Sequence, residues 1–361
     1  MSANFDQVQY TDQLLPFQLG TVARFRKAGT INFTAHSTAL TPLELPRVGF
    51  LSTIIVQFRG VVDVGAAAAF ADLGPWNLMA RIRLLSNQGM ANIFDLTGFG
   101  AFLVSNFFRY GSRMDRAGVG DTVPGVNYFA APLVAGPNNW VLSWIIPVSC
   151  NDNTDFIVGL INKQTAETRL SLEIVTGAQL DAYTVAGTGV TAASSNFHIY
   201  EEYYETPPPE SVQYPELIVH RLLEEQQPVF QTNQNIYTIP RQGILMGAYN
   251  YLRLDGARSD AWDSADVVFN KTDTIRQQER QWLKLYNTKT NGNEIPAGVW
   301  YHDFWRADGR PSAGSLRDCL APERVATSEL VVNITTGAVF GANNNFLNTI
   351  RRILQRAQPA A

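Results

Sequence analysis

The sequence predicts an all-β protein built from two tandem β-sandwiches, and three observations support this fold class. Most apolar segments are short, rich in β-branched or aromatic residues, and separated by Gly, Pro and Asn turns. The chain has 361 residues, which is more than one hydrophobic core normally organises. Three consecutive prolines, Pro207, Pro208 and Pro209, separate two stretches that share the same strand-like pattern. Two sandwiches joined at the prolines follow from these features.

The first sandwich is expected over residues 20–206. Its last segment alternates in the way that a strand requires, because His198 and Tyr200 fall on one face while Ile199 and Tyr203 fall on the other. Strands are predicted at 30–35, 50–62, 79–85, 140–147, 169–175 and 196–205.

The prolines begin a hinge that we place at residues 207–215. Proline has no backbone N–H to donate to a strand ladder, so three in a row favour a stiff extended spacer. After the hinge the strand pattern resumes in a second sandwich over residues 216–340. Strands are predicted there at 216–220, 234–239, 244–254, 298–304 and 329–334.

Each half contains one insertion with helical character, and these are the few short helices expected in loops. Residues 93–110 are apolar nearly all round, as in a helix pressed between a sheet and a neighbouring surface. Residues 274–287 place Ile275, Trp282 and Tyr286 near one stripe, and Asp273 is positioned to cap the helix.

A C-terminal segment, residues 341–361, predicts an amphipathic basic helix. Its apolar residues recur at helical spacing, and its arginines lie towards the C-terminal end, where positive charge favours the helix dipole. We expect this helix either to contact a membrane or a neighbouring subunit or to close the core of the second sandwich. The residues concerned are Phe346, Leu347, Ile350, Arg351, Arg352, Ile353, Leu354 and Arg356.

The remaining segments are an N-terminal arm and two long loops. The arm, residues 1–19, is polar with scattered apolar residues, and Pro16 interrupts any helix, so we expect it to order on contact with a neighbour. The loops at 109–138 and 176–195 are expected to form towers on an outer surface.

Composition excludes several classes of protein. Charged residues make up only 17%, so much of the surface is neutral and suited to burial against neighbours. A net charge of −4 lacks the positive field that attracts nucleic acid, and no direct nucleic-acid binding is expected. The N-terminus has no secretory signal and no apolar run long enough to span a membrane is present, so a cytosolic site of synthesis is predicted. Cys150 and Cys319 are expected to be reduced thiols.

No constellation of residues predicts catalysis, so we expect neither an enzyme nor a cofactor or metal site. The four histidines, His36, His198, His220 and His302, show no metal-binding spacing, and phosphate-binding and nucleophile motifs are missing. Acidic residues near the hinge are expected to form a solvated edge, and the alternatives are glycosidase carboxylates or a calcium site: Glu201, Glu202, Glu205, Glu224 and Glu225. Aromatic residues that offer a carbohydrate platform, or else packing between the sandwiches, are Tyr200, Tyr203, Tyr204, Trp300, Tyr301, Phe304 and Trp305.

Several blocks of the sequence resemble the major capsid proteins of tailless, membrane-containing bacteriophages of the tectivirus type. The first is the run ADLGPWNLMARIRL at 71–84, which enters a strand through a Gly-Pro turn. Others are WIIP at 144–147, residues 152–155, GLIN at 159–162, ETRLSLEI at 167–174 and GVWYHD at 298–303. The blocks cover about a fifth of the chain directly, and their order extends the resemblance over most of it.

The resemblance implies two eight-stranded jelly rolls that stand perpendicular to a shell, with three subunits forming a pseudo-hexagonal capsomer. It implies a structural role in an icosahedral virion that encloses a membrane, after assembly in the host cytoplasm. The implied partners are further copies of the chain, penton or minor capsid proteins, and the surface of the internal lipid membrane. The alternative function is a jelly-roll protein that binds carbohydrate or acts as a receptor-binding spike.

Overall fold

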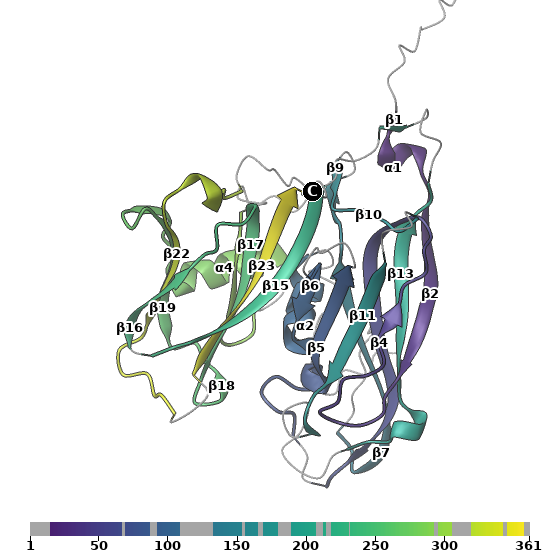
Figure 1. Cartoon of the computed structure of the whole chain (residues 1–361). Helices are drawn as coiled ribbons and strands as arrows, with labels where there is room; N and C mark the ends of the chain where they lie inside the picture. The colour runs from purple at the N-terminus through teal and green to yellow at the C-terminus, as the bar shows by residue number, and fades with distance from the viewer. Residues whose placement is uncertain are drawn as a thin grey trace, which may run out of the picture.

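The computed structural model describes residues 15–66, 69–86, 92–108, 133–153, 156–164, 169–179, 189–206, 212–213, 218–230, 232–291, 295–304, 319–341 and 345–356. Two β-sandwiches lie side by side in it (Figure 1). We call the unit from β2 to β13 the first roll and the unit from β15 to β23 the second roll. The N-terminal arm up to residue 14, most of the two long loops and Pro207, Pro208 and Pro209 lie outside the described residues.

The first roll consists of two layers built on four main strands each, and the two-residue strands β10 and β12 also pair with β4 of the outer layer. The layer far from the second roll, which we call the first outer sheet, has the order β2-β13-β4-β7, and the first inner sheet has the order β3-β11-β5-β6. The bounds are β2 Ala23–Asn32, β3 Leu43–Glu44, β4 Phe50–Val64, β5 Met79–Ser86, β6 Phe94–Leu96, β7 Gly136–Pro147, β11 Leu170–Thr176 and β13 Asn196–Tyr204.

The second roll repeats this plan strand by strand. Its second inner sheet, which faces the first roll, has the order β15-β23-β17 with β21 also paired to β17, and its second outer sheet has the order β16-β22-β19-β20. Each main strand of the first roll therefore has a counterpart in the second, in chain order and in sheet order. The bounds are β15 Ile218–Pro228, β16 Asn233–Thr238, β17 Ile244–Leu254, β19 Trp262–Phe269, β20 Asp273–Arg276, β21 Val299–Asp303, β22 Ser328–Ile334 and β23 Phe346–Arg356.

Short elements complete the described part of the chain. Two helices of more than two turns are α2 (Gly98–Phe108), between β6 and β7, and α4 (Arg280–Asn291), between β20 and β21. The others are β1 Leu15–Pro16, α1 Phe17–Gly20, η1 Trp76–Leu78, β8 Cys150–Asn153, β9 Phe156–Val158, β10 Ile161–Asn162, β12 Gly189–Val190, η2 Ala192–Ser194, β14 Val212–Gln213, β18 Ala257–Arg258 and η4 Pro322–Arg324.

Sequence alternation explains why these segments are strands. In β11 every second residue is buried, and Leu170, Leu172 and Ile174 point into the first core. The prediction of an all-β chain with two eight-stranded sandwiches is confirmed, and the expected strand at 244–254 coincides with β17. The strand β19 has no counterpart among the strands predicted from the sequence.

A continuous sheet joins the two rolls. β6 of the first roll pairs in parallel with β15 of the second, through Phe94 opposite Leu222 and Asp95 opposite Leu223. Because of this pairing, the first and second inner sheets form one nine-stranded sheet. The larger hydrophobic core also crosses the boundary, since Tyr251 and Ile350 of the second roll belong to the same cluster as the side chains of the first roll.

The predicted C-terminal helix is wrong. Residues 346–356 form β23, which lies between β15 and β17 and pairs with both. Leu347 and Ile353 point into the core of the second roll, while Ile350 on the opposite face belongs to the cluster shared with the first roll. A strand that is buried on both faces carries apolar residues at odd and even positions, and this pattern resembles helical spacing.

Both predicted insertions contain a helix that starts later than expected. In the first, Phe94–Leu96 is strand β6, because it pairs with β5 and β15, and the helix begins only at Gly98. In the second, Asp273–Arg276 is strand β20 paired with β19, so Asp273 does not cap the helix, which begins at Arg280.

Candidate assembly surfaces

Glu224 on β15 holds the two rolls together at the centre of their junction. Its carboxylate accepts hydrogen bonds from the Thr97 backbone N–H at 2.7 Å, from the Tyr251 hydroxyl at 2.6 Å and from the Asn348 amide at 2.9 Å. Burial and the adjacent negative charge of Glu224 raise the pKa of Tyr251 well above its usual value, so the phenol stays protonated and donates. The expected solvated edge is therefore wrong at Glu224.

Helix α2 fills the space between the rolls. Phe99 packs edge-on against Tyr251 of the second roll with ring centroids 5.0 Å apart, while Trp76 and Phe102 stack on the side of the first roll. A Cβ at Gly100 would overlap the Glu224 carboxylate, so a larger residue there would have to displace that carboxylate from its hydrogen bonds. The helix is thus fitted to a surface on each roll, as its nearly all-round apolar character predicts.

Ion pairs close one side of the same junction. Asp72 of the first roll accepts hydrogen bonds from the backbone N–H and the Nε of Arg258 at 2.9 and 3.2 Å, and Arg253 lies 3.7 Å away. The Arg258 guanidinium also lies over the Phe99 ring, 5.3 Å from its centroid. Apolar packing, shared hydrogen bonds and opposite charges therefore fix one orientation of the rolls.

A second buried polar cluster lies inside the first roll. Glu201 is fully buried, accepts a hydrogen bond from Lys163 Nζ at 2.5 Å and pairs with Arg26 as well. Burial lowers the pKa of Lys163, while the hydrogen bond and the charge of Glu201 oppose that shift. The expectation of a solvated edge is wrong at Glu201 also. Two cations around one carboxylate indicate a structural ion-pair network.

The predicted contact residues of the C-terminal segment are mostly internal. Leu347, Ile350, Ile353 and Leu354 are buried within the chain's own sheets. Arg351 on the inward face pairs with Glu225 at 3.0 Å, and no side-chain environment is described for Arg356. Of the two alternatives for this segment, its burial favours a role in the core of the second roll.

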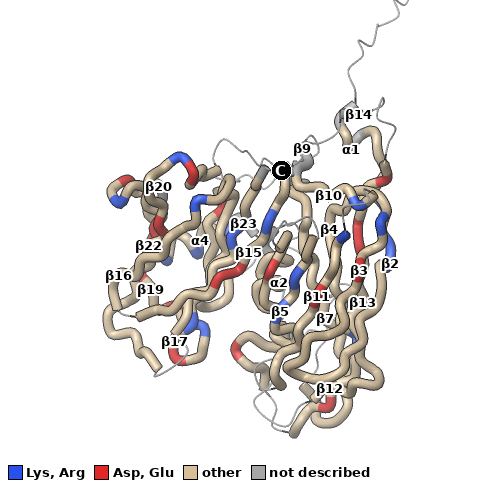
Figure 2. The backbone as a smooth tube through the Cα atoms, viewed as in Figure 1, with Lys and Arg blue, Asp and Glu red and all other residues tan. Residues whose placement is uncertain are grey.

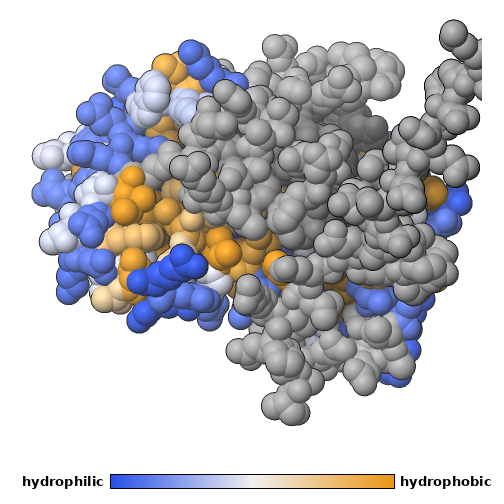
Figure 3. All heavy atoms as spheres, turned by 90° about the horizontal axis from the view of Figure 1, so that it is seen from above, coloured by the Kyte–Doolittle hydropathy of each residue, from blue (hydrophilic) through white to orange (hydrophobic). Residues whose placement is uncertain are grey.

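Arg352 lies in a buried cluster where the first roll meets the second. Its guanidinium contacts Cys150 Sγ at 2.8 Å and His220 Nε2 at 3.2 Å. Both cysteines are free thiols, with Cys150 buried and Cys319 partly buried. Figure 3 looks down on this end of the molecule and shows hydrophobic residues in a band on the side of the second roll.

The aromatic residues considered as a carbohydrate platform are divided between core and surface. Trp300, Tyr301 and Phe304 are buried inside the molecule, so they form no exposed platform, and Trp305 lies outside the described residues. Tyr200 is partly exposed on the first outer sheet, where it stacks with the exposed Phe25 at 5.5 Å.

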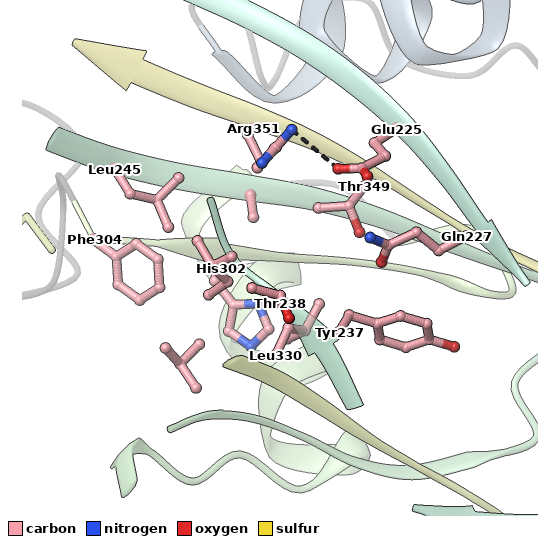
Figure 4. A pocket seen from close by; sticks show the side chains of 13 residues that line it. Glu225, Gln227, Tyr237, Thr238, Leu245, His302, Phe304, Leu330, Thr349 and Arg351 are labelled. Atoms are coloured by element: carbon pink, nitrogen blue, oxygen red, sulfur yellow. Dashed lines mark ion pairs between the residues drawn. The ribbon is translucent and has the colours of Figure 1, made fainter. Parts of the chain in front are cut away.

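The pocket inside the second roll is far smaller than a ligand pocket. Figure 4 shows the pocket between the sheets of the second roll, with Arg351 and Glu225 at one end and Tyr237 and His302 among its walls. Its volume of about 30 Å³ has room for a few water molecules, whereas ligand pockets span about 300–1,000 Å³. An open groove of about 540 Å³ lies on the exposed face of the second outer sheet and is lined by residues including Gln234, Ile236, Glu329 and Asn333.

Within the described ranges, no three His, Cys, Asp or Glu side chains are grouped to hold a metal ion. His302 is buried on β21 and its ring contacts the Ala265 carbonyl at 3.1 Å. The histidine is thus part of the packing of the second roll. None of the helices in the described part is long and apolar enough to cross a membrane.

The outward surfaces are the remaining candidates for function. On the far side of the first roll, Phe25 is exposed, and Lys27 and Arg59 give that face positive charge (Figure 2). On the second roll, Trp282 and Leu285 are exposed on α4. Large exposed apolar side chains gathered in this way indicate protein contacts.

Comparison with solved structures identifies the architecture. The chain is similar to the STIV MCP, from the Sulfolobus Turreted Icosahedral Virus, at a TM-score of 0.68 and 14% identity, over 93% of this chain and 97% of that chain. The fold is the double jelly roll. VP54 of PBCV-1 is similar at a TM-score of 0.61 and 12% identity, over 92% of this double jelly roll and 93% of VP54. The major capsid protein P2 from bacteriophage PM2 is similar at 0.55 and 9%, over 93% and 98%.

No protein-family model matches the sequence of this double jelly roll. A search of curated proteins also gives no match. The resemblance expected from short sequence blocks is thus borne out by the three-dimensional fold of capsid proteins, at sequence identities of 14%, 12% and 9%.

Sequence reasoning did not find the junction residues Asp72 and Glu224 or the exposed pair on α4. A charged residue whose partners are distant in the sequence shows no local pattern from which the contact could be predicted. For α4 the signal is present, because Trp282 and Leu285 are three residues apart and therefore share a helix face.

Proposed function

We propose that this protein is a capsid shell protein and that the double jelly roll is a building block of an icosahedral virion, with no enzymatic role. The observation that carries the proposal is similarity over nearly the whole length, 93% of this chain and 97% of the STIV MCP, with both rolls matched. Additional support comes from the fixed junction between the rolls, since a shell unit needs one shape.

We further propose that three copies form a capsomer of six rolls and that capsomers contact one another and penton or minor capsid proteins. The support is the repeated plan of the two rolls. Because the rolls are alike, three chains arranged head to tail in a ring would place six similar rolls around one axis. The low content of charged residues, 17%, suits extensive burial between copies.

We propose an enclosed membrane on the resemblance to the capsid proteins of membrane-containing bacteriophages alone. The second ground for it, a basic C-terminal helix, is wrong, because residues 346–356 form the central strand β23. Arg351 and Arg352 are committed to contacts inside the chain, with Glu225 and with Cys150 and His220.

The test is the assembly state of the purified protein. Light scattering coupled to size exclusion is expected to give three times the 40.0 kDa chain mass, and electron microscopy is expected to show particles with a six-lobed outline. A monomer that forms no larger assembly at high concentration contradicts the proposal. Binding to a glycan array by such a monomer would support the carbohydrate-binding alternative.

A further inference from the structure

The junction inside the chain provides a pattern for contacts between chains. α2 follows β6 and precedes β7, and it packs on β7 and β5 of its own roll. Its other side meets the second inner sheet, where Phe99 contacts Tyr251 of β17 and Gly100 approaches Glu224 of β15. A helix of one roll therefore covers the β15-β23-β17 sheet of the next roll.

α4 is the counterpart of α2 in the second roll. It follows β20 and precedes β21, and it packs on β21 and β19, the counterparts of β7 and β5. Leu283 is fully buried, and the Asn287 side chain makes two hydrogen bonds of 2.9 Å with the Tyr301 backbone, so the helix is fixed to its roll. Away from these contacts, Trp282 is 57% exposed and Leu285 is 50% exposed.

The first outer sheet is the counterpart of the sheet that α2 covers. Both have the same strand order, β2-β13-β4 in the first roll and β15-β23-β17 in the second. On the first outer sheet, Phe25 of β2 is 61% exposed and lies flat against Tyr200 of β13. Each half of the contact made inside the chain thus recurs on an outward surface of the same chain.

Apolar contact, and not net charge, favours pairing these surfaces. On the first outer sheet, Glu202 lies opposite Phe25 in the register of β13 with β2, so the positive charge of Lys27 has a carboxylate nearby. On α4, Lys284 pairs with Asp260 of its own roll. The exposed apolar side chains of both surfaces are thus the groups that gain from burial.

We propose that α4 of one copy docks on the first outer sheet of a second copy, with Trp282 and Leu285 placed against Phe25 and Tyr200. This contact repeats between chains the contact that α2 makes within a chain. It is heterologous, since different surfaces of the two copies meet, and a head-to-tail contact of this kind forms a ring of three copies when the rotation from copy to copy is one third of a turn. The inference rests on the proposed capsomer and names the surfaces that build it.

The first test removes the apolar contact. A Trp282→Glu/Leu285→Glu variant is expected to weaken self-association at least about 30-fold, as loss of a central aromatic anchor does, and to elute as a folded monomer in light scattering. Val339→Glu is the matched control, because Val339 is 73% exposed on another loop and is expected to leave assembly unchanged. Circular dichroism and thermal melting check that both variants remain folded.

The second test establishes which surfaces meet. Chains carrying Trp282→Cys and Phe25→Cys together are expected to cross-link into dimers and trimers with a short bismaleimide, whereas either substitution alone is expected to give no more cross-linking than wild type. Cross-linking by Trp282→Cys alone, or a folded assembly that survives the double glutamate change, overturns the inference and leaves the shell function standing. A wild-type protein that is monomeric removes the proposed function itself.

Discussion

At the scale of single residues, two of the carboxylates that looked available for chemistry are engaged within the fold. Glu201 is held by Lys163 and Arg26, and Glu224 by Thr97, Tyr251 and Asn348. Glu201 is fully buried, so removal of Lys163 leaves a buried charge without its full compensation, and breaking a buried pair in this way typically costs about 3–5 kcal/mol. These residues therefore specify the packing of the fold.

His220 gives the stability of the fold a dependence on pH. Burial, and then the nearby positive charge of Arg352, lower its pKa well below the ordinary value of 6.5. Below about pH 6.5, His220 is protonated in the unfolded chain but stays neutral in the folded chain. The free energy of unfolding therefore falls as the pH is lowered, by up to about 1.4 kcal/mol per pH unit. Above that pH the histidine is neutral in both states and this contribution is fully present.

Chemical denaturation at pH 7.5 and pH 5.0 measures this effect. The loss of stability between the two values is expected to be smaller in a His220→Gln variant than in the wild type. His198→Gln is the control for a partly exposed histidine and is expected to change the difference little. An identical loss in His220→Gln and wild type contradicts the assignment.

At the scale of elements, β23 is the strand whose loss is expected to destabilise the fold most. It is hydrogen-bonded to β15 along its full length on one side and to β17 on the other, and both of its faces are covered. A chain that ends before Phe346 is expected to be insoluble or unfolded, because two neighbouring strands lose their partner. Circular dichroism and solubility after expression provide the measurement. Removal of residues 357–361 alone is the control and is expected to preserve the melting temperature.

Strands that have one solvent-exposed face are the easiest to predict from the sequence. β11 alternates between buried and partly exposed residues, and β4 carries runs of β-branched residues between turns, so both are visible in the sequence. β23 was mistaken for a helix because burial on both faces removes the alternation. The start of α2 was misplaced because β6 pairs with β15, which is distant in the sequence, and no local preference encodes such pairing. The start of α4 was misplaced because β20 forms a hairpin with β19, a strand that was not predicted from the sequence.

At the scale of the whole molecule, the two rolls are expected to unfold as one unit. They share a nine-stranded sheet, a continuous apolar cluster and the hydrogen bonds of Glu224. The sequence suggested two units separated at the prolines, and it could not reveal the junction, whose contacts join residues more than a hundred positions apart, as Thr97 and Glu224 do.

Tryptophan fluorescence can follow each roll separately, since Trp140 and Trp144 are buried in the first roll and Trp262 and Trp300 in the second. Variants that retain the tryptophans of only one roll are expected to show the same denaturation midpoint, and calorimetry is expected to show a single transition. Two separated midpoints would mean that the shared sheet does not couple the rolls.

The pairing of β6 with β15 also has a mechanical consequence. Two domains joined by a flexible linker can tilt against each other. A sheet whose hydrogen bonds cross from one domain to the next opposes such tilting. In a curved shell built from such units, the angle within each chain is constant. Differences in curvature from place to place must then arise entirely at the seams between chains.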